Sequence, residues 1–168
     1  MNVQIPGEVS SLSQTPSGTF VFVRVGSNVH FGIKAEYDNK NYVVVLSPGH
    51  PQVGSVPGFY EASAIDGRQC LTIPEAALVP LYGTSTIDLG HFDFRAGMIA
   101  LIGKEKFLIL QTDARQVGYL DLSNGKLLDS IETHRAAWLT EYEIRRSVGG
   151  IAETLFRFPR DFGRPKDK

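Results

Sequence analysis

The chain has 168 residues, 42% apolar and 21% charged, which is near ordinary globular usage and excludes a disordered chain, a collagen-like rod and a coiled coil. A single cysteine, Cys70, excludes an intramolecular disulfide framework and a multi-cysteine zinc site. The formal net charge of −1 gives no general electrostatic reason to bind nucleic acid or an anionic membrane.

The first residues do not have the pattern of a targeting segment. Residues 1–6 lack the basic region and the apolar run of a signal peptide, and no stretch of about 18 apolar residues occurs along the chain. We therefore expect no membrane span and a cytoplasmic location, where a lone thiol stays reduced. Residues 7–18 are rich in Ser, Pro and Thr, so residues 1–18 are predicted to be a flexible segment.

Residues 19–46 predict three antiparallel strands. Thr19–Val25 is β-branched and aromatic, Asn28–Tyr37 alternates apolar and polar residues with period two, and Tyr42–Leu46 is apolar on both faces. Turn-forming residues separate these segments at 26–27 and at 38–41. A turn over 38–41 predicts three cross-strand pairs, namely Tyr37 with Tyr42, Ala35 with Val44 and Ile33 with Leu46.

Residues 48–97 differ from the rest of the chain. They hold five of the nine prolines and seven of the seventeen glycines, so only short strands are expected there. The candidates are Gly58–Ala64, Gln69–Ile73 and His91–Arg95. Long irregular connections in a compact domain often carry binding residues, so this region is the first place to look for a site.

Residues 98–131 predict two further hairpins. Met98–Ile102 and Phe107–Leu110 flank a turn at 103–106, and Arg115–Leu122 and Leu127–Ile131 flank a turn at 123–126. The second turn contains Asn124-Gly125, the strongest short hairpin signal.

Residues 134–158 allow two interpretations. His134–Arg146 has passable helix propensity, and Thr140 with Glu143 matches a capping box. On a helical wheel, however, the apolar residues do not share a face. As a strand the segment alternates, and Gly149-Gly150 turns it into Ile151–Phe158. We favour the hairpin, with a helical turn near Thr133–Ala137 and with three predicted cross-strand pairs: Arg146 with Glu153, Ile144 with Leu155 and Tyr142 with Arg157.

Together these segments predict an all-β, mostly antiparallel fold. We expect a single-domain barrel or sandwich of successive hairpins over residues 19–158, with at most one or two short helical turns. Residues 159–168 contain two prolines and charges of both signs, so they are predicted to be a flexible tail.

The strongest local constellation of polar residues is in His91–Arg95. In an extended segment His91, Asp93 and Arg95 share one face, whereas Phe92 and Phe94 point the other way. Asp93 can orient the His91 imidazole for acid–base chemistry, and Arg95 can grip an anion. An ordinary solvent-facing strand with an ion pair explains the same pattern.

Other candidates are weaker on sequence grounds. His50, in a loop after a buried strand, Tyr60 and Arg95 are taken as candidate ligand-binding residues. The histidines show no metal-ligand spacing, and the usual nucleotide and serine-enzyme signatures are absent, so no metal and no cofactor are expected. Cys70 fits a small buried core residue better than a nucleophile.

The sequence therefore favours a non-catalytic binding or interaction module, using residues 48–97 or a sheet edge, with an unknown protein or small molecule as partner. One alternative is a small hydrolase or lyase that uses His91 and Asp93. A second is a self-associating subunit, a homo-oligomer through edge strands such as Thr19–Val25. Because no clustered basic groove accompanies the aromatic residues, the sequence argues against a nucleic-acid partner.

Overall fold

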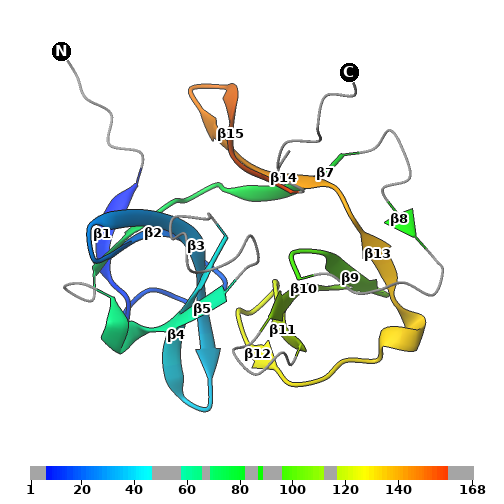
Figure 1. Ribbon diagram of the computed structural model, residues 1–168. Helices are drawn as coiled ribbons and strands as arrows, with labels where there is room; N and C mark the ends of the chain where they lie inside the picture. Colours follow the sequence, from blue (N-terminus) through cyan, green and yellow to red (C-terminus); the bar gives the residue numbers. More distant parts are fainter. Residues whose placement is uncertain are drawn as a thin grey trace, which may run out of the picture.

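The computed structural model describes residues 7–46, 58–65, 69–81, 87–88, 96–111 and 117–158, and these are mostly antiparallel strands (Figure 1). Two 3₁₀ turns, η1 (Ala62–Ala64) and η3 (Thr133–Arg135), accompany the strands in these ranges. The all-β, mostly antiparallel prediction is confirmed. The arrangement forms no closed barrel and is consistent with a sandwich.

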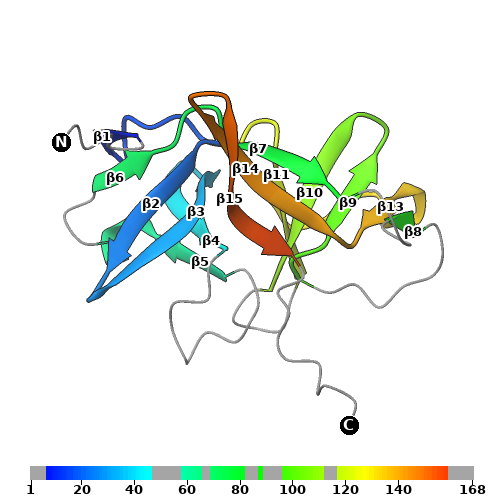
Figure 2. The ribbon, with the colours of Figure 1, turned by 90° about the horizontal axis from the view of Figure 1, so that it is seen from above.

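Three sheets organise the described part of the chain. The first sheet has the strand order β1 (Glu8–Ser11), β6 (Gln69–Thr72), β2 (Phe20–Val25), β3 (Asn28–Tyr37), β4 (Lys40–Val45), β5 (Gly58–Glu61). The second has the order β12 (Leu127–Leu128), β11 (Val117–Asp121), β10 (Glu105–Gln111), β9 (Ile99–Ile102), β13 (Ala137–Leu139), β8 (Ile87–Asp88). The third has the order β15 (Ile151–Phe158), β14 (Tyr142–Val148), β7 (Ala77–Pro80). Figures 1 and 2 show the first two sheets on opposite sides, with the third running across between them.

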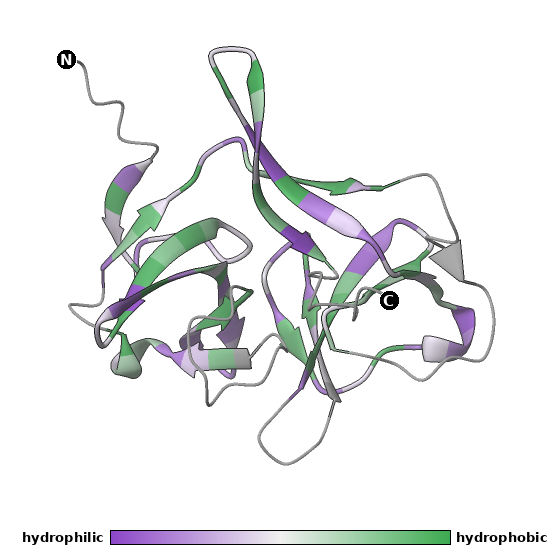
Figure 3. Cartoon of the chain, turned by 45° about the horizontal axis from the view of Figure 1, so that its top comes forward, coloured by the Kyte–Doolittle hydropathy of each residue, from purple (hydrophilic) through white to green (hydrophobic). Residues whose placement is uncertain are grey.

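The largest hydrophobic cluster lies where the three sheets meet, and we call it the central cluster. Its fully buried members come from all three sheets: Phe31, Ile33, Ala35, Val44, Leu46, Ile73, Ile99, Leu108, Leu110, Leu120, Leu139, Tyr142, Ile144 and Phe156. The opposite faces of the first two sheets hold clusters of their own, around Val21, Val43 and Cys70 and around Ala100, Ile109 and Trp138. Figure 3 accordingly shows hydrophobic residues along the strands. In β14 and β15, hydrophobic residues alternate with hydrophilic ones.

The predicted strands of residues 19–46 form, but the second turn is shorter than expected. Asp38 and Asn39 alone make the turn between β3 and β4, and both have positive φ, +48° and +59°. Asp and Asn tolerate this left-handed conformation, which matches the strand twist of a tight hairpin. Ile33 therefore opposes Val44 rather than Leu46, and the predicted pairs are wrong by two residues. A shift of two residues keeps every side chain on its expected face.

The C-terminal hairpin is confirmed, and so is the predicted pair of Arg146 with Glu153. The two other predicted pairs are wrong by one residue, because a β-bulge interrupts the ladder between Ile144 and Arg145. The bulge places Phe156 opposite Ile144 and Phe158 opposite Tyr142, so aromatic rings face the central cluster. The chain also bends before this hairpin, since β13 and β14 lie in different sheets.

Residues 48–97 contribute short strands, as expected. Gly58–Ala64 is replaced by β5 and η1, Gln69–Ile73 corresponds to β6, and two strands, β7 and β8, were not expected. Thr19–Val25 is not an edge strand, because β2 lies between β6 and β3. This pairing joins segments far apart in sequence, which periodicity alone does not reveal. His91–Arg95 lies outside the described residues.

The first and second sheets are joined by a turn as well as by the central cluster. The Asp121 carboxylate accepts hydrogen bonds from the Ser123 amide and hydroxyl and from the Asn124 side chain, at 2.6–2.8 Å. This fixes the turn so that Gly125, with φ +72°, donates its amide to the Asp121 carbonyl and accepts a hydrogen bond from the Glu36 amide at 2.9 Å. The turn therefore lies against β3, next to residues of the segment before β2, which includes the buried Leu12.

We predict that Gly125→Ala destabilises the chain far more than Gly26→Ala. Both glycines have positive φ, which costs alanine about 1 kcal/mol at either position. A Cβ at Gly125 would also lie 2.1 Å from the Gly18 backbone nitrogen, whereas one at Gly26 meets nothing within 4 Å. Urea unfolding should give a loss of about 1 kcal/mol for Gly26→Ala and at least about twice that for Gly125→Ala. Equal losses of unfolding free energy in the two variants would contradict the close contact between Gly125 and Gly18.

Candidate functional site

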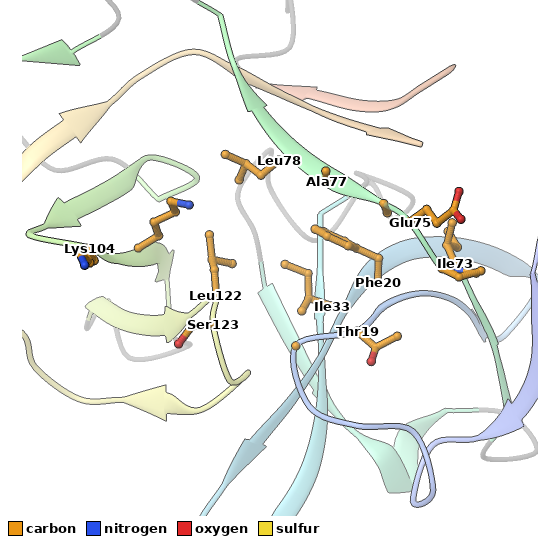
Figure 4. A pocket seen from close by; sticks show the side chains of 14 residues that line it. Thr19, Phe20, Ile33, Ile73, Glu75, Ala77, Leu78, Lys104, Leu122 and Ser123 are labelled. Atoms are coloured by element: carbon orange, nitrogen blue, oxygen red, sulfur yellow. The ribbon is translucent and has the colours of Figure 1, made fainter. Parts of the chain in front are cut away.

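A cleft of about 560 Å³ opens between the first sheet, the connection from β6 to β7 and the hairpins of the second sheet (Figure 4). Its walls come from four parts of the chain: the start of β2 with Ile33 of β3, residues 73–78, the turn between β9 and β10, and the end of β11. Segments distant in sequence therefore converge on one site.

The floor of the cleft is apolar because it is an outer margin of the central cluster. Phe20 and Ile33 oppose each other across β2 and β3, and Phe20 stacks on Phe31 with ring centroids 5.8 Å apart. Leu78 and Leu122 are half-buried and pack against the same cluster. The apolar surface that lines the cleft is thus held in place by side chains that are fully buried behind it.

The rim of the cleft is polar and charged. Lys104 and Lys106 are exposed residues of the turn between β9 and β10 and of β10 itself. Figure 4 shows Lys104 on one side and Glu75 on the other, with Ile33 and Leu122 between them. None of the three charged groups forms a salt bridge with another residue that the structure describes.

The backbone at Glu75 is strained. Glu75 follows Pro74 in the turn after β6 and has a φ of +65°, a conformation that favours glycine and costs other residues about 1 kcal/mol or more. Through this turn the chain passes from the first sheet, where β6 ends, into β7 of the third sheet. Ala76, Ala77 and Leu78 follow directly and line the cleft.

A second group of polar side chains is buried on the other face of the first sheet. Lys34 is 1% exposed, and its ammonium group donates to Asn41 Oδ1 at 2.7 Å, to the Ala35 carbonyl at 3.0 Å and to Ser17 Oγ at 3.4 Å. Burial lowers the pKa of Lys34, and the charges of Glu36 and Cys70 only partly oppose this. These three acceptors satisfy the amine, which indicates a structural role.

Cys70 and His30 belong to this buried face too. The Cys70 thiol lies 3.2 Å from Thr15 Oγ1 and is 3% exposed, so Cys70 is the small buried core residue that the sequence predicted. His30 is 2% exposed, and its Nδ1 has no hydrogen-bond partner in the described part of the chain. The His30 ring lies 6.4 Å from that of Tyr60, measured between centroids.

Of the residues predicted to form a site, the structure describes Tyr60. Tyr60 is half-buried in β5, packs against the cluster around Val43 and does not line the cleft. His50, His91, Asp93 and Arg95 lie outside the described residues, so their roles stay predictions. Within the described ranges, no three His, Cys, Asp or Glu side chains are grouped as metal ligands.

Sequence reasoning missed the two lysines of the rim because they were assigned to a turn. Lys106 continues, with period two, the face of β10 that carries Leu108 and Leu110 into the central cluster, and Lys104 lies two residues earlier, in the turn. A basic residue that extends a buried apolar face is a signal for a charged rim. Residues 73–78, by contrast, lie in the region that the sequence singled out.

Comparison with protein-family models, curated proteins and solved structures finds no match for this chain. In the described ranges, no helix has the length and apolar character needed to cross a membrane.

We predict that Lys34 makes stability rise with pH on the alkaline side. Because burial lowers the pKa of Lys34, the unfolded chain binds more protons than the folded chain between that lowered value and the ordinary value of about 10.4. The free energy of unfolding should therefore increase with pH in this window, and Lys34→Met should lack the increase.

Urea unfolding of both proteins between pH 7 and about 10.5 measures the difference. Burial raises the pKa of Tyr142, which works in the opposite direction at high pH, but Tyr142 is present in both proteins and cancels in the comparison. Parallel stability curves for the two proteins would show that the Lys34 amine is not desolvated.

Proposed function

We propose that this chain is a non-catalytic binding module that holds a small amphipathic molecule in the cleft. The observation that carries the proposal is the combination of a firmly supported apolar floor with charged side chains at the rim that lack a described partner. Small-molecule sites are usually clefts of about 300–1,000 Å³ with mostly apolar walls and a few polar groups, and this cleft of about 560 Å³ falls within that range.

The position of the cleft supports a small molecule rather than an extended chain as ligand. It is walled by three parts of the fold, and residues 73–78 of the loop-rich region form one wall. A sheet edge, by contrast, would bind an extended strand through its backbone.

Three other hypotheses come from the sequence alone. Acid–base catalysis by His91 and Asp93 stays a prediction, and so do self-association through edge strands and a cytoplasmic location. The ionisable residues that line the cleft in the described ranges are two lysines and Glu75, without a histidine.

Filling the cleft tests the proposed function. Ala76 lines the cleft and packs, half-buried, against the central cluster, so the side chain of Ala76→Trp should occupy the ligand's space over the apolar floor. Ala152→Trp, on an exposed position of β15 outside the cleft, is the matched control. The probes are three eight-carbon amphiphiles with different head groups: octanoate, 1-octanol and octyltrimethylammonium.

Ligand-observed NMR should detect saturable binding of at least one probe to the unmodified chain and to Ala152→Trp. The same probe should bind Ala76→Trp at least about tenfold more weakly, because the indole replaces it against the apolar floor. Thermal unfolding identifies a misfolded variant, in which case Ala76→Phe takes its place. If none of the three probes binds, or if filling the cleft leaves affinity unchanged, the proposed function is wrong.

A further inference from the structure

The charge of the cleft rim narrows the chemistry of the ligand, provided that the proposed function holds. Lys104, Glu105 and Lys106 follow one another at the turn into β10. Since alternate residues of a strand point to opposite faces, Lys106 lies on the cleft side of β10 and Glu105 on the other, and Lys104 lies in the turn just before β10. The cleft lining agrees, because it includes Lys104 and Lys106 but not Glu105.

Neither ammonium group forms a salt bridge within the described ranges. The four salt bridges found there involve residues of η3 and of the hairpin of β14 and β15 and of their flanks, none of which lines the cleft. Glu75, the carboxylate of the described lining, is separated from Lys104 by the apolar floor (Figure 4). The lysine side of the rim therefore carries positive charge available to a ligand.

The backbone that carries these lysines is fixed on both sides. Lys106 pairs with Leu101 of β9, and its carbonyl accepts a hydrogen bond from the Leu122 amide at 2.9 Å. Gly103, with φ +61°, and Lys104 form the turn between β9 and β10. The two cationic groups thus extend from a rigid hairpin, which limits the conformational entropy lost when they bind an anion.

The Ser123 hydroxyl, another polar group of the rim, already has a hydrogen-bond partner. The Ser123 hydroxyl donates to the Asp121 carboxylate at 2.6 Å, which leaves the lysines as the strong donors on this side of the cleft. Leu122, next to Ser123, and Ile33 lie between the lysines and Glu75. One cleft therefore offers cationic groups to a charged head group and apolar surface to a hydrocarbon tail.

We propose that the ligand is an anionic amphiphile, a free small molecule whose head group is held by Lys104 and Lys106 and whose apolar part lies on Phe20, Ile33 and Leu122. A neutral head group would gain no charge attraction from the two lysines, and a cationic one would be repelled by them.

The three eight-carbon probes test this inference by their order of affinity. Octanoate should bind about tenfold more tightly than 1-octanol, and octyltrimethylammonium should bind most weakly. Added salt should weaken octanoate binding and leave 1-octanol binding nearly unchanged, because screening acts on the charged pair alone. Isothermal titration calorimetry with the full chain gives the affinities.

Two double variants test whether the lysines of the rim cause the preference for octanoate over 1-octanol. Lys104→Gln with Lys106→Gln should bring the affinities for octanoate and 1-octanol to within about twofold of each other, because octanoate loses its partners. Arg24→Gln with Lys40→Gln removes the same net charge at exposed positions away from the cleft and should keep the preference for octanoate.

The failures of the two proposals are distinguishable. If 1-octanol or octyltrimethylammonium binds as tightly as octanoate, and Ala76→Trp abolishes that binding, the inference about charge is wrong and the binding module stands. If the control double variant loses the preference as well, the effect is one of net charge and the inference is wrong. If no probe binds, both proposals fail.

Discussion

The central cluster is the interaction on which the rest of the structure depends, because each of the three sheets buries one face in it. Phe31 and Ile33 come from the first sheet, Leu108 and Leu110 from the second, and Ile144 from the third. Each fully buried aliphatic or aromatic side chain contributes about 1.5–3 kcal/mol. The first two sheets also bury their other faces, each in a cluster of its own.

The cleft exists because the central cluster is not covered completely at one margin. Ile33 belongs to both the cluster and the cleft, and Phe20, Leu78 and Leu122 pack on the cluster while they line the cleft. A ligand there would contact the side chains that hold the sheets together. Binding to the folded state alone would then stabilise the whole arrangement.

Local sequence patterns predicted most strands and the helical turn at Thr133–Arg135, because period-two alternation and turn residues act over a few positions. Register was less predictable. The turn at Asp38-Asn39 and the bulge beside Ile144 depend on backbone conformations that several sequences permit. The cleft was not predictable, since Ile33, residues 73–78 and Lys104 meet only through long-range pairing that leaves no local signal.

The most direct measurement of the central claim is a titration of the isotopically labelled chain with octanoate, followed by amide chemical shifts. The account predicts that the shifts concentrate on residues 18–20, 73–78, 104–106 and 122–123, which surround the cleft. Shifts that concentrate instead at the exposed tip of the hairpin of β14 and β15, around Ile151, or on the edge strand β1 would contradict it.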